Sequence, residues 1–128
     1  MNLNRLGVAH NYYQRMDEFK RVLTVCSAGC LRSPTAAVVL AMSPYNFNTR
    51  AAGCTEEYAI ILVDEILIAW ADEIVFMEQN HKDAVADSLD ISGKSTIVLD
   101  IPDRFSYRDP DLMAMIRERY DMATEGQT

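Results

Sequence analysis

The chain has 128 residues, which is enough for one domain with a buried core and too few for two. Hydrophobic residues make up 49% of it and charged residues 24%, a balance typical of a soluble globular domain. The net charge of −7 argues against broad nucleic-acid binding, which normally uses a basic surface, so any anion site must be built locally from backbone amides and one or two arginines.

Membrane insertion and secretion are not expected from this sequence. No apolar run approaches the roughly 20 residues that are needed to span a bilayer. Residues 1–20 lack an apolar core of signal-peptide type, which argues against secretion. We therefore expect a cytoplasmic protein with no membrane partner, whose three cysteines are reduced. The sequence indicates no particular oligomeric state.

The first twenty residues form an N-terminal extension. Tyr12, Met16 and Phe19 fall on roughly one helical face, so a short helix packed on the domain is one interpretation. An extension without a catalytic role is the other. We expect the main domain to span residues 21–122 and residues 123–128 to form a flexible tail.

Beyond the extension, short β-branched apolar runs alternate with helical patterns. Strands are predicted over residues 21–25, 46–52, 73–77 and 95–99. Helices are predicted after Ser33, within residues 63–71, over residues 80–89 and from Pro110 to about Met122. Because strands that alternate with helices form parallel sheets covered on both faces, we expect an α/β three-layer sandwich around a four-stranded parallel sheet, with right-handed crossovers.

One stretch, CSAGCLRS, lies between the first predicted strand and the first predicted helix. The strand ends at Cys26, and Gly29 lies inside the loop that follows. Ser33 and Pro34 are typical of a helix N-cap and of the first helical position. A cysteine six residues before an arginine is a weak signal alone, because the spacing arises often by chance. At the junction of a strand and a helix N-terminus, where α/β proteins bind anions, it predicts a phosphate-binding loop.

The chemistry of this loop follows from its charges. Converging loop amides and the positive end of a helix favour a bound anion, and the same field favours a thiolate at Cys26. The planar fork of Arg32 matches two phosphate oxygens, and the hydroxyl of Ser33 can donate a hydrogen bond to the sulfur. A thiolate held under a bound phosphate indicates phosphoryl transfer through a cysteinyl-phosphate intermediate.

The segment VCSAGCLRSPTA resembles the signature loop of the low-molecular-weight protein tyrosine phosphatases. Three further segments resemble the family in order: Arg50–Gly53, WADEIVFMEQNH, and VLDIPDRFSYRDPDLMAMI, the last especially similar to a short bacterial branch of predicted tyrosine phosphatases. The resemblance covers residues 21–120. It implies the fold of that family and a metal-free hydrolysis of phosphotyrosine or a similar aryl phosphate. It also implies no cofactor, and a phosphorylated protein or a small aryl phosphate as substrate.

The resemblance implies a role for each residue of the loop. The nucleophile falls on Cys26, the phosphate-binding arginine on Arg32, and the serine that supports the thiolate on Ser33. The amides that bind phosphate belong to Arg32 and to the preceding loop residues Ser27, Ala28, Gly29, Cys30 and Leu31.

In the family that the loop resembles, an aspartate after the fourth strand protonates the leaving phenolate and then activates water. The matching position, counted back from Leu112 in the last predicted helix, is Asp103. Asp100 and Asp109 are the alternatives. A helix N-cap also explains Asp109, which precedes Pro110, and a turn at the end of the strand explains Asp100.

Aromatic residues follow the predicted general acid. Phe105 falls where the family places an aromatic wall of the substrate cleft, on which a phosphotyrosine ring would stack. Tyr107 either adds to this wall or packs the loop onto the core.

The loop departs from the family pattern at three positions. Gly29 replaces an asparagine whose side chain usually braces the loop, although glycine keeps the left-handed conformation accessible. Leu31 replaces the second cysteine of typical members, and the extra cysteine here is Cys30. Cys30 either forms a reversible disulfide with Cys26 that protects the nucleophile from over-oxidation, or serves as a small apolar filler.

The remaining polar and sulfur-containing residues are interpreted as structural. We expect Cys54 to be a partly buried thiol and His81 to lie on the surface near a helix start. The acidic pairs Asp64–Glu65 and Asp72–Glu73 are interpreted as solvated helix ends. No Cys/His cluster has metal-ligand spacing, so no metal is expected.

Two other functions compete with hydrolysis. A catalytically weak phosphate- or phosphopeptide-binding regulator would explain the loss of the bracing asparagine and the N-terminal extension. An arsenate reductase on the same fold would need further cysteines to relay a disulfide away from the nucleophile, and residues 73–128 contain none.

Overall fold

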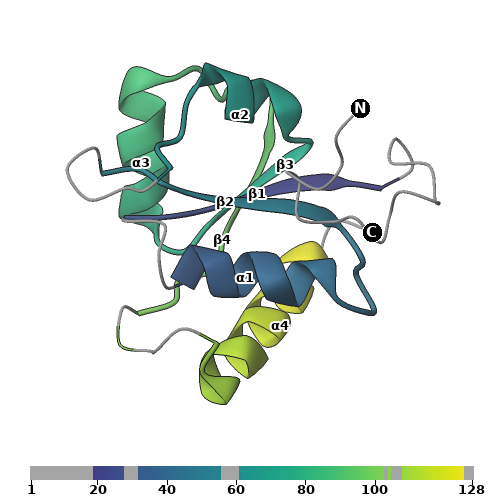
Figure 1. The fold of residues 1–128 in the computed structure, drawn as a ribbon. Coiled ribbons are helices and arrows are strands. Elements are labelled where there is room, and N and C mark those ends of the chain that lie inside the picture. Colours follow the sequence, from purple (N-terminus) through teal and green to yellow (C-terminus); the bar gives the residue numbers. More distant parts are fainter. Residues whose placement is uncertain (1–18, 28–31, 56–60, 103, 105–107, 126–128) are drawn as a thin grey trace.

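The computed structural model describes residues 19–27, 32–55, 61–102, 104 and 108–125. Within them, strands and helices alternate along the chain (Figure 1). The strands are β1 (Arg21–Cys26), β2 (Asn48–Gly53), β3 (Glu73–Phe76) and β4 (Ser95–Val98). The helices are α1 (Arg32–Ala41), α2 (Glu65–Trp70), α3 (Gln79–Ser88) and α4 (Pro110–Glu125).

The four strands form one parallel sheet in the order β2-β1-β3-β4. In this register Cys26 at the end of β1 lies opposite Gly53 of β2, and Val25 lies opposite Phe76 of β3. The strands are short, and β1 and β3 are buried along almost their whole length, as expected for strands covered on both faces. The predicted four-stranded parallel sheet is therefore confirmed.

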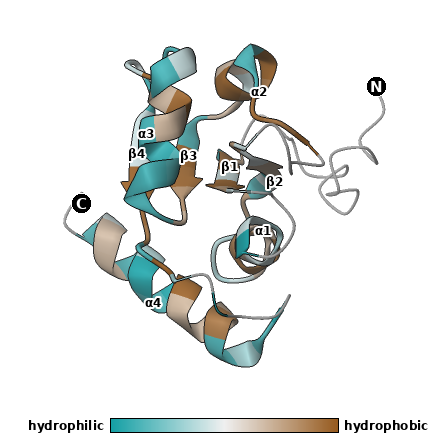
Figure 2. Ribbon diagram, turned by 90° about the vertical axis from the view of Figure 1, so that its left-hand side faces the viewer, coloured by the Kyte–Doolittle hydropathy of each residue, from teal (hydrophilic) through white to brown (hydrophobic). Residues whose placement is uncertain are grey.

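Helices cover both faces of the sheet, with α1 and α4 on one side and α2 and α3 on the other (Figure 2). Alternation along β1 divides its side chains between these layers: Val22 and Cys26 pack under α1 and α4, whereas Leu23 and Val25 pack under α2 and α3. Two apolar clusters thus sandwich the sheet, and the predicted three-layer architecture is confirmed.

Two helix boundaries differ from the sequence-based expectation. Helix α1 begins at Arg32, so Ser33 lies buried in the first turn and is not the N-cap residue that was predicted. Helix α4 continues through Glu125, about three residues beyond the expected end, and Ala123 packs against the adjacent apolar cluster. The helix therefore extends into residues 123–125, which were predicted to belong to a flexible tail.

Several elements end or begin where local sequence signals place them. Asp64 caps α2 by accepting a hydrogen bond from the backbone N–H of Leu67 at 2.8 Å. Pro44 follows the end of α1 in a turn with a cis Ser43–Pro44 peptide bond.

No helix in the described part of the chain combines the length and the apolar character needed to cross a bilayer. The helix predicted within the N-terminal extension lies outside the described residues.

A buried carboxylate lies at the amino-terminal end of strand β3. Glu73, predicted to be solvated, is only 1% exposed, because it opens the buried strand β3. Lys20 approaches it at 3.0 Å, and the hydroxyl of Tyr120 in α4 donates a hydrogen bond to it at 2.8 Å. Burial, and then this carboxylate, raise the pKa of Tyr120 above its usual range. The cluster joins the start of the domain to its last helix.

Replacing Tyr120 by Phe should destabilise the fold, because the ring stays while Glu73 loses a buried hydrogen bond. We expect the free energy of unfolding to fall by about 1–3 kcal/mol, measured by urea denaturation at pH 7. Tyr45→Phe is the matched control, since its hydroxyl bonds the exposed Asp121 at 2.6 Å. Equal losses in the two variants would contradict a special role for the buried carboxylate.

Candidate active site

The carboxyl end of β1 and the first turn of α1 meet at the predicted phosphate-binding loop. Cys26 is 4% exposed, and its Sγ lies 3.2 Å from the hydroxyl oxygen of Ser33. That hydroxyl also lies 3.3 Å from the carbonyl oxygen of Ala52 in β2. Because a hydroxyl rotates freely, Ser33 can accept from a thiol while donating to Ala52, or turn to donate to a thiolate.

A second hydrogen bond holds the start of α1 against the sheet. The hydroxyl of Thr24 in β1 donates to the carbonyl of Ser33 at 2.7 Å. Thr24 and Ser33 are both fully buried, so this bond is shielded from water. The helix N-terminus is therefore fixed beside the sulfur of Cys26, as the sequence pattern predicted.

Arg32 is 3% exposed although it carries a permanent charge. One of its nitrogens, Nη1, forms an ion pair with the carboxylate of Glu78 and donates to the carbonyl of Ile101 at 2.8 Å. Glu78 directly precedes α3, and Ile101 follows β4. The guanidinium plane is thus set by two groups from distant parts of the chain, which orients its remaining N–H donors.

The chain around the predicted general acid is held against α1 on both sides. Two residues before Asp103, the carbonyl of Ile101 accepts from Arg32. Five residues after it, the backbone N–H of Arg108 donates to the hydroxyl of Thr35 in the first turn of α1, at 2.9 Å. These two contacts place Ile101 and Arg108 against the start of α1.

The two alternative acids have other roles in the structure. The carboxylate of Asp109 accepts a hydrogen bond from the backbone N–H of Asp111 at 2.8 Å, as expected of a residue that caps α4. Asp100 has a left-handed backbone, φ 58°, in the turn after β4, and its carbonyl accepts from Arg119 at 2.7 Å. Both interpretations made from the sequence, a cap and a turn, agree with these contacts.

His81 belongs to the site, which the sequence did not predict. It is 1% exposed, and its Nε2 lies 3.0 Å from the hydroxyl oxygen of Ser27, the residue after Cys26. The expectation of a surface position was wrong, because the first turn of α3 faces the end of β1 and not solvent. A histidine three residues after an acidic N-cap residue is not a sequence signature of a ligand site, so only the fold reveals it.

Cys54 follows β2, and its backbone N–H donates to the carbonyl of Cys26 at 2.9 Å. It is partly buried, as predicted, and packs against the cluster under α2 and α3, whereas Cys26 packs on the opposite face of the sheet. Burial is the main cause that raises the pKa of its thiol. A raised pKa lowers the fraction of Cys54 that is thiolate at neutral pH, which makes its thiol a weak nucleophile there.

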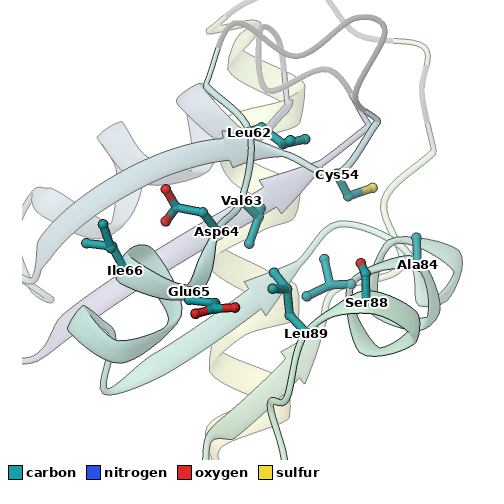
Figure 3. A pocket seen from close by; sticks show the side chains of 10 residues that line it. Cys54, Leu62, Val63, Asp64, Glu65, Ile66, Ala84, Ser88 and Leu89 are labelled. Atoms are coloured by element: carbon teal, nitrogen blue, oxygen red, sulfur yellow. The ribbon is translucent and has the colours of Figure 1, made fainter.

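A groove runs beside Cys54 between the start of α2 and the second half of α3 (Figure 3). Apolar side chains line it, among them Leu62, Val63 and Leu89, and the acidic side chain of Glu65 lies at its edge. Among the described residues, neither Cys26 nor Arg32 lines it.

Several predicted site residues lie outside the described residues. They are Ala28, Gly29, Cys30, Leu31, Asp103, Phe105 and Tyr107. The described members of the site, Cys26, Ser27, Arg32 and Ser33, are brought together at one edge of the sheet. Among the described residues no group of three or more His, Cys, Asp or Glu side chains is arranged to hold a metal.

No protein-family model matches the chain, and no curated protein matches it. Solved structures, in contrast, are similar over most of its length. Wzb from Vibrio vulnificus, solved with benzylphosphonate, has a TM-score of 0.64 at 22% identity and covers 85% of this chain and 97% of its own. The YwlE arginine phosphatase from Geobacillus stearothermophilus has a TM-score of 0.61 at 21% identity, covering 84% and 96%.

A third structure is named for the family that the sequence motifs indicated. SP-PTP, a low molecular weight protein tyrosine phosphatase from Streptococcus pyogenes, has a TM-score of 0.66 at 13% identity and covers 86% of this chain and 94% of its own. The chain has the fold of these phosphatases. The resemblance seen in the loop and in the later segments is thus confirmed at the level of fold.

Ser33→Ala should slow alkylation of Cys26 by iodoacetamide, because the thiolate loses a hydrogen-bond donor. We expect the rate at pH 7 to fall by about 3- to 10-fold, on the order of one hydrogen bond. Peptide mapping by mass spectrometry follows each cysteine separately, and Cys54, with its raised pKa, should react slowly in both proteins and faster as the pH rises. An unchanged rate at Cys26 would show that Ser33 does not support the thiolate.

Proposed function

We propose that this protein hydrolyses phosphomonoesters, with phosphotyrosine or a similar aryl phosphate as substrate, without a metal and through a cysteinyl-phosphate. The observation that carries the proposal is the contact between Cys26 and Ser33 beside the oriented guanidinium of Arg32. A thiol nucleophile, a hydroxyl for its thiolate and a fixed arginine together form the minimum needed to bind and attack a phosphate.

In the first step the thiolate of Cys26 attacks phosphorus and the bond from phosphorus to the leaving oxygen breaks. The amides of residues 27–32 and the guanidinium of Arg32 balance the charge on the three equatorial oxygens. Asp103 gives its proton to the leaving phenolate. Ser33 stabilises the thiolate before attack and the thiolate that is released at the end.

In the second step a water molecule attacks the cysteinyl-phosphate, and Asp103, now a carboxylate, takes a proton from this water. The sulfur–phosphorus bond breaks, and Cys26 leaves as a thiolate with inorganic phosphate as the product. The contacts of Ile101 with Arg32 and of Arg108 with Thr35 support the assignment of Asp103, because they hold residues on both sides of it against α1. A thiolate nucleophile also suits a reducing compartment such as the cytoplasm.

The first test is hydrolysis of p-nitrophenyl phosphate by the reduced protein in the presence of a chelator. We expect turnover that persists with chelator and falls by at least about 10³-fold in Cys26→Ser, because the hydroxyl is a far weaker nucleophile. Cys54→Ser is the matched control and should keep nearly full activity. Phosphate binding without turnover in the wild-type protein would instead support a phosphate-binding regulator.

Asp103→Asn and Asp109→Asn should separate the general acid from the helix cap. With phenyl phosphate, whose leaving group needs a proton, we expect Asp103→Asn to lower kcat by about 10²- to 10⁴-fold. Asp109→Asn retains a capping side chain, so its kcat should stay within about twofold of wild type. A large loss in Asp109→Asn with normal activity in Asp103→Asn would reassign the acid.

The substrate class is testable because the similar structures include both tyrosine and arginine phosphatases. We expect higher kcat/KM on a phosphotyrosine peptide than on the same peptide carrying phosphoarginine, since Phe105 is placed by the sequence resemblance to stack on a planar ring. The reverse preference would overturn the aryl phosphate assignment and leave the cysteinyl-phosphate chemistry intact.

A further inference from the structure

The side chain of His81 connects α3 to the residue that follows the proposed nucleophile. Its Nε2 lies 3.0 Å from the Oγ of Ser27, and the ring is almost completely buried. A buried imidazole must satisfy both of its nitrogens, and the carboxylate of Glu78 also lies 3.9 Å from Nε2.

The second ring nitrogen defines the tautomer. The backbone N–H of Glu78 points at Nδ1 of His81 at 3.1 Å. Nδ1 therefore accepts, and in the neutral ring the proton is on Nε2, which donates to the hydroxyl oxygen of Ser27. In this arrangement Nε2 is not available as a base, so Ser27 is held as a hydrogen-bond acceptor and is not activated as a nucleophile.

The same turn of chain also holds the other end of the loop. Glu78, whose backbone positions the imidazole, uses its carboxylate to bind the guanidinium of Arg32. Ser27 and Arg32 are the first and last residues between the nucleophile and the body of α1. The start of α3 and the residue before it thus contact both ends of the loop: His81 contacts Ser27, and Glu78 contacts Arg32.

We propose that His81 is a positioning residue that holds the amino-terminal half of the phosphate-binding loop in its anion-binding shape through the hydroxyl of Ser27. The inference rests on the proposed function for its catalytic consequence. Gly29 has no side chain with which to brace the loop from inside. The support comes from outside the loop, from the first turn of α3.

The role predicts a specific pattern in phosphate binding. His81→Ala and Ser27→Ala should each weaken the binding of inorganic phosphate by about 5- to 10-fold, the effect of one lost hydrogen bond. The double variant should be within about twofold of His81→Ala, since both changes remove one interaction. Asn80→Ala, an exposed neighbour in the same turn, is the matched control and should bind as wild type does.

Two further readouts separate positioning from a merely structural contribution. In ¹⁵N spectra, His81 should show an unprotonated Nδ1 and a protonated Nε2 at neutral pH. Amide hydrogen exchange of residues 27–32 should accelerate in His81→Ala and in Ser27→Ala alike. His81→Gln, whose amide offers both a donor and an acceptor, should recover most of the phosphate affinity. If His81→Ala fails to fold, the same role is tested by phosphate binding of Ser27→Ala and His81→Gln and by the ¹⁵N spectrum of the wild-type protein.

The outcomes distinguish this inference from the proposed function. Independent, multiplicative effects of the two substitutions, a proton on Nδ1, or unchanged exchange of residues 27–32 would overturn the role of His81. A wild-type protein that binds phosphate without turnover, yet shows the coupling between Ser27 and His81, would contradict the proposed hydrolase and support the loop brace. If the wild-type protein binds no phosphate, the exchange measurement decides the inference alone.

Discussion

The buried guanidinium of Arg32 is the constraint on which the site depends. The guanidinium is 3% exposed and has lost most of its hydration. This desolvation is tolerated only when charged and polar groups of the protein replace the lost water. Here they are the carboxylate of Glu78 and the carbonyl of Ile101. These partners follow β3 and β4, so the adjacency of β1, β3 and β4 in a parallel sheet is what makes the burial possible.

Strand β3 is held to the chain around β1 at both of its ends by ion pairs. At the amino-terminal edge Glu73 pairs with Lys20, and beyond the carboxyl end Glu78 pairs with Arg32. The two basic residues, Lys20 and Arg32, lie on either side of β1 in the sequence. The stretches of β1 and β3 between the two ion pairs are mostly apolar. This arrangement places the charges at the two edges of the sheet and leaves its centre to hydrophobic packing. The amino-terminal pair supports the fold, and the carboxyl-terminal pair shapes the proposed site.

The proposed chemistry uses contributions from separate segments that serve different purposes. Helix α1 supplies the arginine, the supporting serine and the positive end of a helix. The start of α3 supplies His81, which contacts Ser27, and Glu78 directly before α3 pairs with Arg32. The segment after β4 is anchored to α1 at Ile101 and Arg108, which lie on either side of the proposed acid in the sequence. A substitution in α3 can therefore change the reaction without touching the substrate.

The sequence by itself determined the features that depend on neighbouring residues. Apolar β-branched runs predicted four strands because burial on both faces of a sheet leaves that local signature, and the loop between Cys26 and Arg32 followed from a strand end, a glycine and a helix start. The fold agrees with that interpretation, and Cys26 lies beside Ser33 where β1 meets α1. The roles of His81 and Glu73, which were expected at the surface, and of Glu78, for which no role was predicted, follow from tertiary contacts alone. Their partners lie tens of residues away, and a local pattern carries no record of which charge or hydroxyl the folded chain brings within 3 Å.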